Sequence, residues 1–179
     1  MYMAIWLLPI LFMLHDFEEI IMIGAWKKRN KLTNSNNQSN EKDFLSTKVP
    51  YSDFKSTASF SIGVAVEFLL FSAVSLMAFF LDNYYIWFIF MFAVTFHYLV
   101  HLKMCISFKG YVPGIATSVI CFPISIILLI YVSKEAAFSI YAVIIFCLVG
   151  VLAGILIVKT LHTCMERFDK WLKDFSDYK

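Results

Sequence analysis

Hydrophobic residues occur along this chain in five long runs, separated by shorter polar segments. Each run is close to the 20 or so apolar residues that a helix needs to cross the hydrocarbon core of a bilayer. The pattern predicts transmembrane helices at about 3–26, 58–81, 84–106, 112–132 and 136–158. Because the last three connections are short, neighbouring helices are expected to be antiparallel, in one membrane domain that spans residues 1–179.

Two segments outside these runs have patterns of their own. Residues 27–57 are polar, rich in Asn and Ser and without apolar periodicity, which is typical of a solvated and partly disordered loop. After residue 158, apolar residues recur at helical spacing with basic residues between them. This predicts an amphipathic helix over 160–178 that lies on the inner leaflet. The predicted fold is an all-α, polytopic membrane bundle with an amphipathic C-terminal helix.

Composition agrees with a multi-pass membrane protein. Of the 179 residues, 60% are hydrophobic and 16% are charged, and the mean hydropathy is +0.74, outside the usual range of soluble domains. A formal net charge of +2, with the aromatic residues inside apolar runs, argues against nucleic-acid binding. The four cysteines have no C-x-x-C spacing, so neither a disulfide framework nor a thiolate zinc site is indicated. The lipid bilayer is the expected partner, and the sequence does not indicate an oligomeric state.

Lysine and arginine are concentrated on one side of the predicted bundle. They follow the first, third and fifth helices, whereas Lys134 is the one basic residue of the sequence on the opposite side. Cytoplasmic segments of membrane proteins carry this excess of positive charge. We therefore expect a cell-membrane protein with its N-terminus outside and its C-terminus in the cytosol.

The first apolar run contains ionisable residues that lipid does not accommodate. In "LPILFMLHDFEEIIMIGAW", His15 lies three and four residues before Glu18 and Glu19, so the three project from one side of a helix, while Asp16 is expected to point elsewhere. An acidic residue at a helix centre costs about 3 kcal/mol on the insertion scale, and each Ile, Leu or Phe returns only about 0.5 kcal/mol. These carboxylates therefore need protons, partners or a metal ion.

The next two predicted helices carry further ionisable residues. Glu67 lies in the second, and His97 and His101, four residues apart, lie in the third. With a rise of about 1.5 Å per residue, these side chains and those of the first helix come out at roughly 8–16 Å from the inner edge of the bilayer. Three imidazoles and three carboxylates on antiparallel helices are therefore expected to converge.

Neutral imidazole and carboxylate are ligands for zinc, iron and manganese. The sequence therefore predicts a site for one or two divalent transition metal ions. The predicted ligands are His15, Glu19, His97 and His101. Glu18 is the predicted general base or a bridging ligand, and Glu67 a ligand or a partner that orients an imidazole.

Three further residues have candidate roles. Asp16 is expected to orient a ligand or to form an ion pair. Tyr111 and Thr117, in "YVPGIAT" at the start of the fourth helix, are candidates for contact with a substrate headgroup. The Pro and Gly of that segment are ordinary residues of a turn and a first helical turn.

The motif "HDFEE", His15 to Glu19, in the first helix of a small membrane protein resembles the signature of the HXXEE family of bacterial and archaeal membrane proteins. The pair of histidines in "HYLVH" and the "YVPGIAT" segment are similar to later features of that family. The resemblance covers the chain apart from the polar loop, and it implies the architecture and the importance of His15, Glu18 and Glu19. The family name describes a motif and no activity, so it implies no reaction.

Three classes of function fit this pattern. The first is a metal-dependent membrane enzyme, a hydrolase or an oxidase, whose lipid-like or apolar substrate reaches the site from the bilayer. The second is a transporter of metal ions or protons along the same residues, although the fourth and fifth helices are nearly free of ionisable residues. The third is a non-catalytic immunity or assembly protein in which the cluster holds helices together. The sequence does not choose the reaction, the substrate or the metal.

The orientation is tested by labelling cysteines placed in a variant without the native ones. A membrane-impermeant thiol reagent added outside should modify a cysteine at Asn83 and leave a cysteine at Ser35 unmodified, because residues 27–57 are predicted to be cytosolic. Modification at Ser35 in intact cells would overturn the orientation.

Overall fold

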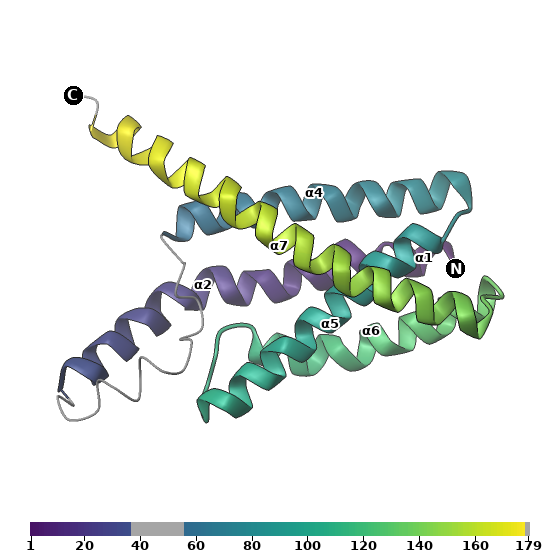
Figure 1. Cartoon of the computed structure of the whole chain (residues 1–179), viewed down its shortest axis with the longest axis horizontal. Helices are drawn as coiled ribbons and strands as arrows, with labels where there is room; N and C mark the ends of the chain where they lie inside the picture. Colours follow the sequence, from purple (N-terminus) through teal and green to yellow (C-terminus); the bar gives the residue numbers. More distant parts are fainter. Residues whose placement is uncertain (37–55, 178–179) are drawn as a thin grey trace.

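The structure is a computed structural model, and it describes residues 1–36 and 56–177, with side chains for 1–30 and 56–177. These residues form six helices and no strand (Figure 1). The helices are α1 (Tyr2–Ile5), α2 (Leu7–Asn36), α4 (Thr57–Leu81), α5 (Tyr85–Phe108), α6 (Ile115–Glu135) and α7 (Ile140–Asp177). The predicted all-α bundle is confirmed.

Among the described helices, α4, α5, α6 and α7 are long and apolar enough to cross a membrane. Their outward faces carry large exposed apolar side chains, such as Leu148 and Leu156 on α7, which suits contact with lipid chains that are as apolar as Leu. α2 is not among these four helices, and its apolar part contains Asp16, Glu18 and Glu19. The crossing of the membrane by α2 stays a prediction.

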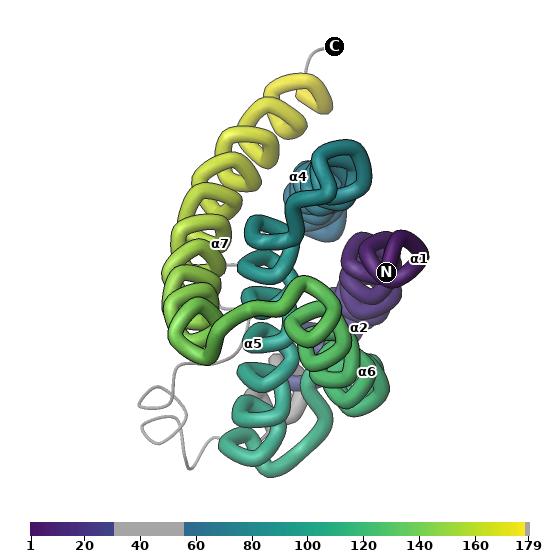
Figure 2. Tube along the Cα trace, turned by 90° about the vertical axis from the view of Figure 1, so that its right-hand side faces the viewer, coloured from purple at the N-terminus to yellow at the C-terminus, as the bar shows by residue number. Residues whose placement is uncertain are grey.

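α5 lies in the middle of the bundle, with α2, α4, α6 and α7 arranged around it (Figure 2). It packs closely against α6 and α7, and α4 packs against α2 and α7. One end of the bundle holds the N-terminus and the connections α4–α5 and α6–α7, and the other end holds the α5–α6 connection and the C-terminus (Figure 1). The helices are thus antiparallel to their neighbours in sequence, as predicted from the short connections.

The first predicted helix is interrupted near its start because of Pro9. Its ring nitrogen has no hydrogen and cannot donate to the carbonyl of Ile5, four residues earlier. The Ile5 oxygen instead accepts hydrogen bonds from Ser75 Oγ on α4 and Trp87 Nε1 on α5, both at 2.8 Å. α1 therefore ends at Ile5, and its last carbonyl joins the start of the chain to two other helices.

α2 continues to Asn36, well beyond the end predicted from hydropathy. The expectation of a loop that begins at residue 27 is therefore wrong for 27–36, which are helical. Lys and Arg are good helix formers, and an existing helix extends at much lower cost than a new one forms. Loss of hydropathy marks the end of lipid contact, not the end of the helix. The rest of the predicted loop, 37–55, lies outside the described residues.

α7 joins two elements that the sequence predicts as separate. Its 38 residues extend about 57 Å, well beyond the ~30 Å of a hydrocarbon core. The segment 160–177 is helical, as predicted, but it continues α7 without a break. The buried Asp169 accepts a hydrogen bond from Ser56 Oγ at 3.1 Å and pairs with Lys173 at 2.8 Å. Because Ser56 is the N-cap of α4, the tail packs against the start of α4.

The carbonyl of Ile5 generates a stability prediction. In Ser75→Ala or Trp87→Phe it keeps one donor, whereas the double variant leaves it buried and unsatisfied, at a cost of about 1–3 kcal/mol. The fall in the free energy of unfolding should therefore be larger in the double variant than the sum of the two single effects. Thermal unfolding in one detergent measures this coupling.

Ser61→Ala is the control, because Ser61 Oγ makes an exposed bond within α4, to the Thr57 carbonyl. Combined with Trp87→Phe, it should give an additive effect. Strict additivity of Ser75→Ala with Trp87→Phe would contradict the shared carbonyl.

Candidate metal centre

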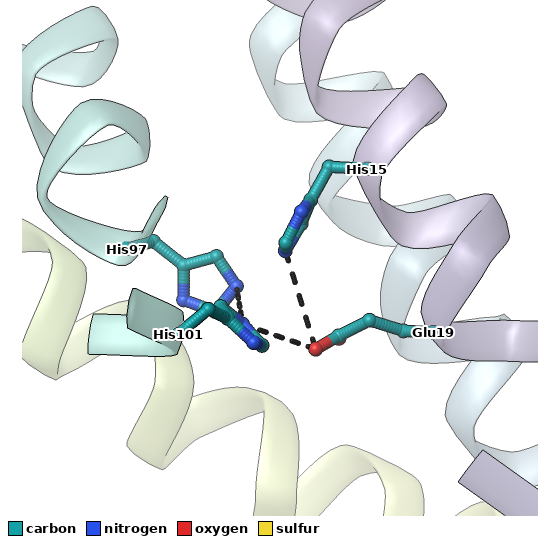
Figure 3. A group of neighbouring side chains, drawn as sticks. All are labelled: His15, Glu19, His97 and His101. Atoms are coloured by element: carbon teal, nitrogen blue, oxygen red, sulfur yellow. Dashed lines mark hydrogen bonds and ion pairs between the residues drawn. The ribbon is translucent and has the colours of Figure 1, made fainter. Parts of the chain in front are cut away.

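Four side chains from α2 and α5 meet inside the bundle (Figure 3). They are His15 and Glu19 from α2 and His97 and His101 from α5, called the four-residue group below. One possible ligand atom of each lies within 4.8 Å of those of the others. Of the three imidazoles and three carboxylates expected to converge, the three imidazoles and Glu19 meet here, and this group can hold a metal ion. That these residues do bind one stays a prediction.

Two contacts in the group are close to the spacing of metal ligands, and all the facing atoms lie within 4.8 Å of one another. His101 Nε2 lies 3.0 Å from His97 Nε2 and 3.1 Å from Glu19 Oε1. His15 Nε2 is 4.0 Å from the same carboxylate oxygen. In a tetrahedral zinc site with bonds of about 2.0–2.1 Å, neighbouring ligand atoms are about 3.3–3.4 Å apart. Only small side-chain movements separate this arrangement from a metal-bound one.

The outer nitrogens of two imidazoles are held by fixed acceptors. His101 Nδ1 lies 3.0 Å from the carbonyl oxygen of Pro113, which can only accept, so Nδ1 carries the hydrogen. His15 Nδ1 lies 3.1 Å from Thr117 Oγ1, and that hydroxyl donates to Glu18 Oε2 at 2.6 Å. Because the Thr117 hydrogen is directed to Glu18, His15 Nδ1 donates in this contact, which is shorter than its other contact, with Ser118 Oγ at 3.4 Å. In both neutral rings Nε2 presents its lone pair to the four-residue group, as a metal ligand must.

The inner nitrogen of His15 lacks a partner. His15 Nε2 is fully buried and has no hydrogen-bond partner among the described residues, which normally costs about 1–3 kcal/mol. Lone pairs of neutral imidazoles and of a carboxylate repel one another unless a proton or a cation lies between them. A metal ion would satisfy His15 Nε2 and remove this repulsion at once. The unpartnered nitrogen therefore fits a group built around a cation.

The connection between α5 and α6 forms a wall of this group. Gly114 has a φ of +84°, and a Cβ at this position would lie 2.8 Å from His15 Cε1 and 2.9 Å from His101 Nδ1. Glycine is therefore needed both for the backbone conformation and for the approach of two imidazoles. Pro113 and Gly114 are more than the turn residues that the sequence suggested. In the sequence, the one sign of this role was the shortness of the connection between α5 and α6, which keeps Pro113 and Gly114 close to the helix that carries His101.

Glu18 points to the start of α6 and is not part of the four-residue group. It accepts hydrogen bonds from the backbone N–H groups of Thr117 at 2.7 Å and Ala116 at 3.3 Å, from Thr117 Oγ1 and from Tyr111 Oη at 2.8 Å. A carboxylate in this place satisfies the free N–H groups of a helix start and interacts favourably with the helix dipole. Its predicted roles as base or bridging ligand stay predictions.

Tyr111 and Thr117, predicted as contacts for a substrate, both bind Glu18. Burial and the hydrogen bond to Glu18 raise the pKa of Tyr111, so the phenol stays protonated and remains a donor. Neither residue lines the cavity beside the group, and their contact with a substrate stays a prediction. In the structure they position His15 and Glu18.

A cavity of about 290 Å³ lies next to the four-residue group. Its polar wall consists of Asp16, Glu19, Glu67, His97, His101 and His162. Successive helical residues are turned by about 100°, so Asp16 is about 60° from Glu19 and nearly opposite Glu18. The expectation that Asp16 points away from the site is therefore wrong. Glu67 faces the cavity without joining the group, and His162 of α7 was not among the predicted site residues.

Comparison with known families identifies the chain. The model of the HXXEE family, described as proteins of unknown function with an HXXEE motif, matches residues 6–128. The chain therefore belongs to this family, as the motif of His15, Glu18 and Glu19 suggested. The match includes the whole four-residue group and ends before α7. No curated protein and no solved structure matches the chain.

The position of Glu18 generates a prediction. In Glu18→Gln an amide replaces the carboxylate, so the charge is lost and an NH2 group faces the N–H donors of α6. We expect the free energy of unfolding to fall by about 1–3 kcal/mol. Glu67→Gln is the matched control, because Glu67 lies at a similar expected depth but faces the cavity. Equal melting temperatures for the two variants would contradict the role of Glu18 at the helix start.

Proposed function

We propose that this member of the HXXEE family is a metal-dependent membrane enzyme that acts on a lipid-like or apolar substrate. The four-residue group would hold one divalent transition metal ion. One observation carries the proposal: Glu19, His97 and His101 of that group also line the cavity. An ion held by these side chains would be within reach of a small molecule, which a purely structural ion does not require.

The donor set limits the choice of metal. Three imidazoles and one carboxylate suit zinc, iron or manganese. Four protein ligands complete a tetrahedral zinc site, whereas iron and manganese accept more ligands and would keep positions open to the cavity. When bound, the ion would supply Lewis-acid or redox chemistry, so hydrolysis and oxidation both stay within the proposal.

The chain's own residues would orient the reactants. Pro113 and Thr117 fix which nitrogen carries hydrogen in His101 and His15, so these two ligands are arranged before an ion binds. Asp16 and Glu67 provide carboxyl groups on the cavity wall that can accept a hydrogen bond or a proton from a bound molecule. The apolar remainder of the wall would exclude water from the reacting groups.

The two alternative classes have less support. A pathway for ions would continue from His15 toward the N-terminal end of α2, but the buried residues there are apolar: Leu8, Leu11 and Phe12. No Asp, Glu, His, Lys or Arg side chain is buried on that side in the described part of the chain. A cluster that merely joins helices would leave His15 Nε2 without a partner. The first observation argues against an ion pathway and the second against a purely structural cluster. Together they favour an ion that stays bound in the four-residue group.

Elemental analysis of protein purified without added metal tests the centre. We expect about one equivalent of zinc, iron or manganese, because four protein ligands suffice for one ion. His15→Ala, His97→Ala, His101→Ala and Glu19→Gln should each lower the metal content, since each removes one donor. His162→Ala is the control, a histidine that lines the cavity outside the group. Equal metal in all variants, or none in the wild type, would contradict the proposal.

The enzymatic part has a separate test. Lipids extracted from cells that express the wild type or His101→Ala can be compared by untargeted mass spectrometry. At least one apolar or amphiphilic species should change in abundance with the wild type and not with the variant. Identical lipid profiles, in cells where the wild type is metal-loaded, would overturn the assignment as a lipid-directed enzyme.

A further inference from the structure

The cavity beside the four-residue group is built mainly from apolar side chains of four helices. Phe12 of α2, Val64 and Phe71 of α4, Val94 of α5 and Ile157 of α7 are among its lining residues. The rings of Phe12 and Phe71 meet edge to face, with centroids 4.7 Å apart. This pair lies one helical turn beyond Asp16 on α2 and Glu67 on α4, and it closes that end of the cavity.

Small residues keep the cavity open along α7. Gly154 lines the cavity, and a Cβ at this position would meet one neighbour, Ala93 Cβ, at an ordinary 3.6 Å. On the facing wall, a Cβ at Gly63 would lie 2.7 Å from the sulfur of Met165. Alanine is therefore tolerated at position 154, whereas a larger side chain there would fill the cavity.

Two carboxyl groups in the cavity have acceptor oxygens available. Asp16 is 3% exposed, and its Oδ2 has no hydrogen-bond partner among the described residues. Glu67 faces the same space from α4. An unsatisfied buried acceptor is costly, and a molecule that brings donors to this place would remove that cost.

The other end of the cavity reaches the surface of the bundle. Val158 and His162 of α7 line the cavity and are exposed, and Val158 belongs to the outward apolar surface that suits lipid contact. A molecule from the bilayer can therefore enter along α7. On the cavity wall Asp16, Glu19 and His101 are buried, and Glu67 and His97 are half-buried, so these polar groups lie deeper than Val158 and His162.

From these four observations we propose that the cavity binds a single-chain amphiphile that enters with its polar end first. That end carries hydrogen-bond donors, a hydroxyl or an amino group, and donates to Asp16 and Glu67 beside the metal centre. The hydrocarbon chain lies along α4 and α7 toward Val158. This inference rests on the proposed function and names its substrate class.

Size and charge disfavour other lipids. A volume of about 290 Å³ is at the lower limit of small-molecule sites, so the cavity suits a small polar end better than a phosphodiester headgroup, which would also add a buried negative charge. A fatty acid presents a carboxylate, which adds a further negative charge to a buried site that already contains Asp16, Glu67 and Glu19. A long-chain alcohol or amine has both the small end and the donors.

Photoaffinity labelling of the full-length protein in phosphatidylcholine nanodiscs tests this inference. The probe is hexadecanol with a diazirine in its chain, and peptide mass spectrometry locates the adducts. We expect adducts in residues 60–67 of α4 and 154–165 of α7. Unlabelled hexadecanol and hexadecylamine should reduce them several-fold, and hexadecanoate at the same concentration should not.

Matched variants sharpen the test. Gly154→Leu should reduce labelling several-fold, while Gly154→Ala should keep it. Glu67→Gln should weaken the preference for alcohol over carboxylate, and Asp16→Asn should do the same if it folds. Leu156→Phe, on the exposed face of α7, is the control for added bulk. Adducts spread evenly over exposed faces, or equal competition by hexadecanoate in the wild type, would overturn the inference.

Metal analysis of the same samples separates this inference from the proposed function. Gly154→Leu should keep its metal and lose its labelling. Metal in the wild type without specific labelling would overturn the amphiphile site alone. Specific labelling of a metal-free wild type would overturn the metal centre and leave the binding site supported.

Discussion

Polar groups inside a bilayer have no water to bind, so each must find its partner within the protein. α2, which is predicted to cross the membrane, carries four ionisable side chains in five residues, His15, Asp16, Glu18 and Glu19. The other helices are arranged so that they supply partners to His15, Glu18 and Glu19. α6 offers its first N–H groups to Glu18, and α5 offers the imidazole of His101 to Glu19. Apolar helix surfaces could pack in several ways with similar free energy. The polar contacts of Glu18 and Glu19, by contrast, form in only one register of α2 against α5 and α6.

The same constraint explains why the α5–α6 connection is more than a link. Within a few residues it supplies a carbonyl to His101, a Cβ-free surface to two imidazoles and a phenol to Glu18. Its backbone groups act where water would act in a soluble protein. Trp26 Nε1 donates to the carbonyl of Tyr111 at 2.6 Å, which holds the connection against α2 near the end of the apolar region.

Much of this could be predicted from the sequence because lipid exposure imposes length and hydropathy on helices directly. The pairs His15/Glu19 and His97/His101 were predictable for a similar reason, since four residues make about one turn and place both side chains on one face. Angular detail was harder. Glu18 and Glu19 both share a side with His15, yet they are about 100° apart around the helix. This angle is large enough that Glu18 contacts α6 and Glu19 contacts α5. Which neighbour occupies each side is decided by packing of distant segments.

Other features were hidden because hydropathy reports the surroundings of a helix and not its continuity. The extension of α2 to Asn36 and the union of the last span with the tail in α7 both cross from apolar to polar sequence without a turn residue at the boundary. The role of Gly114 was hidden differently, because glycine before a helix is common and its contact with imidazoles depends on where α2 lies. Asp16 was misplaced because helical spacing shows which residues share a face with His15 and not which helix lies against the adjacent face.

The partners of Glu18 have a consequence for biosynthesis. Its hydrogen bonds come from residues 93–99 positions later in the chain, so the first long helix to leave the ribosome is the last to have its charges satisfied. Until the start of α6 has emerged, α2 exposes several ionisable groups and is a poor substrate for lateral release into lipid. Contacts this distant in sequence also slow folding. If α2 enters a membrane, we therefore expect the nascent chain to need the insertion machinery to shelter its first helix until the start of α6 has been translated.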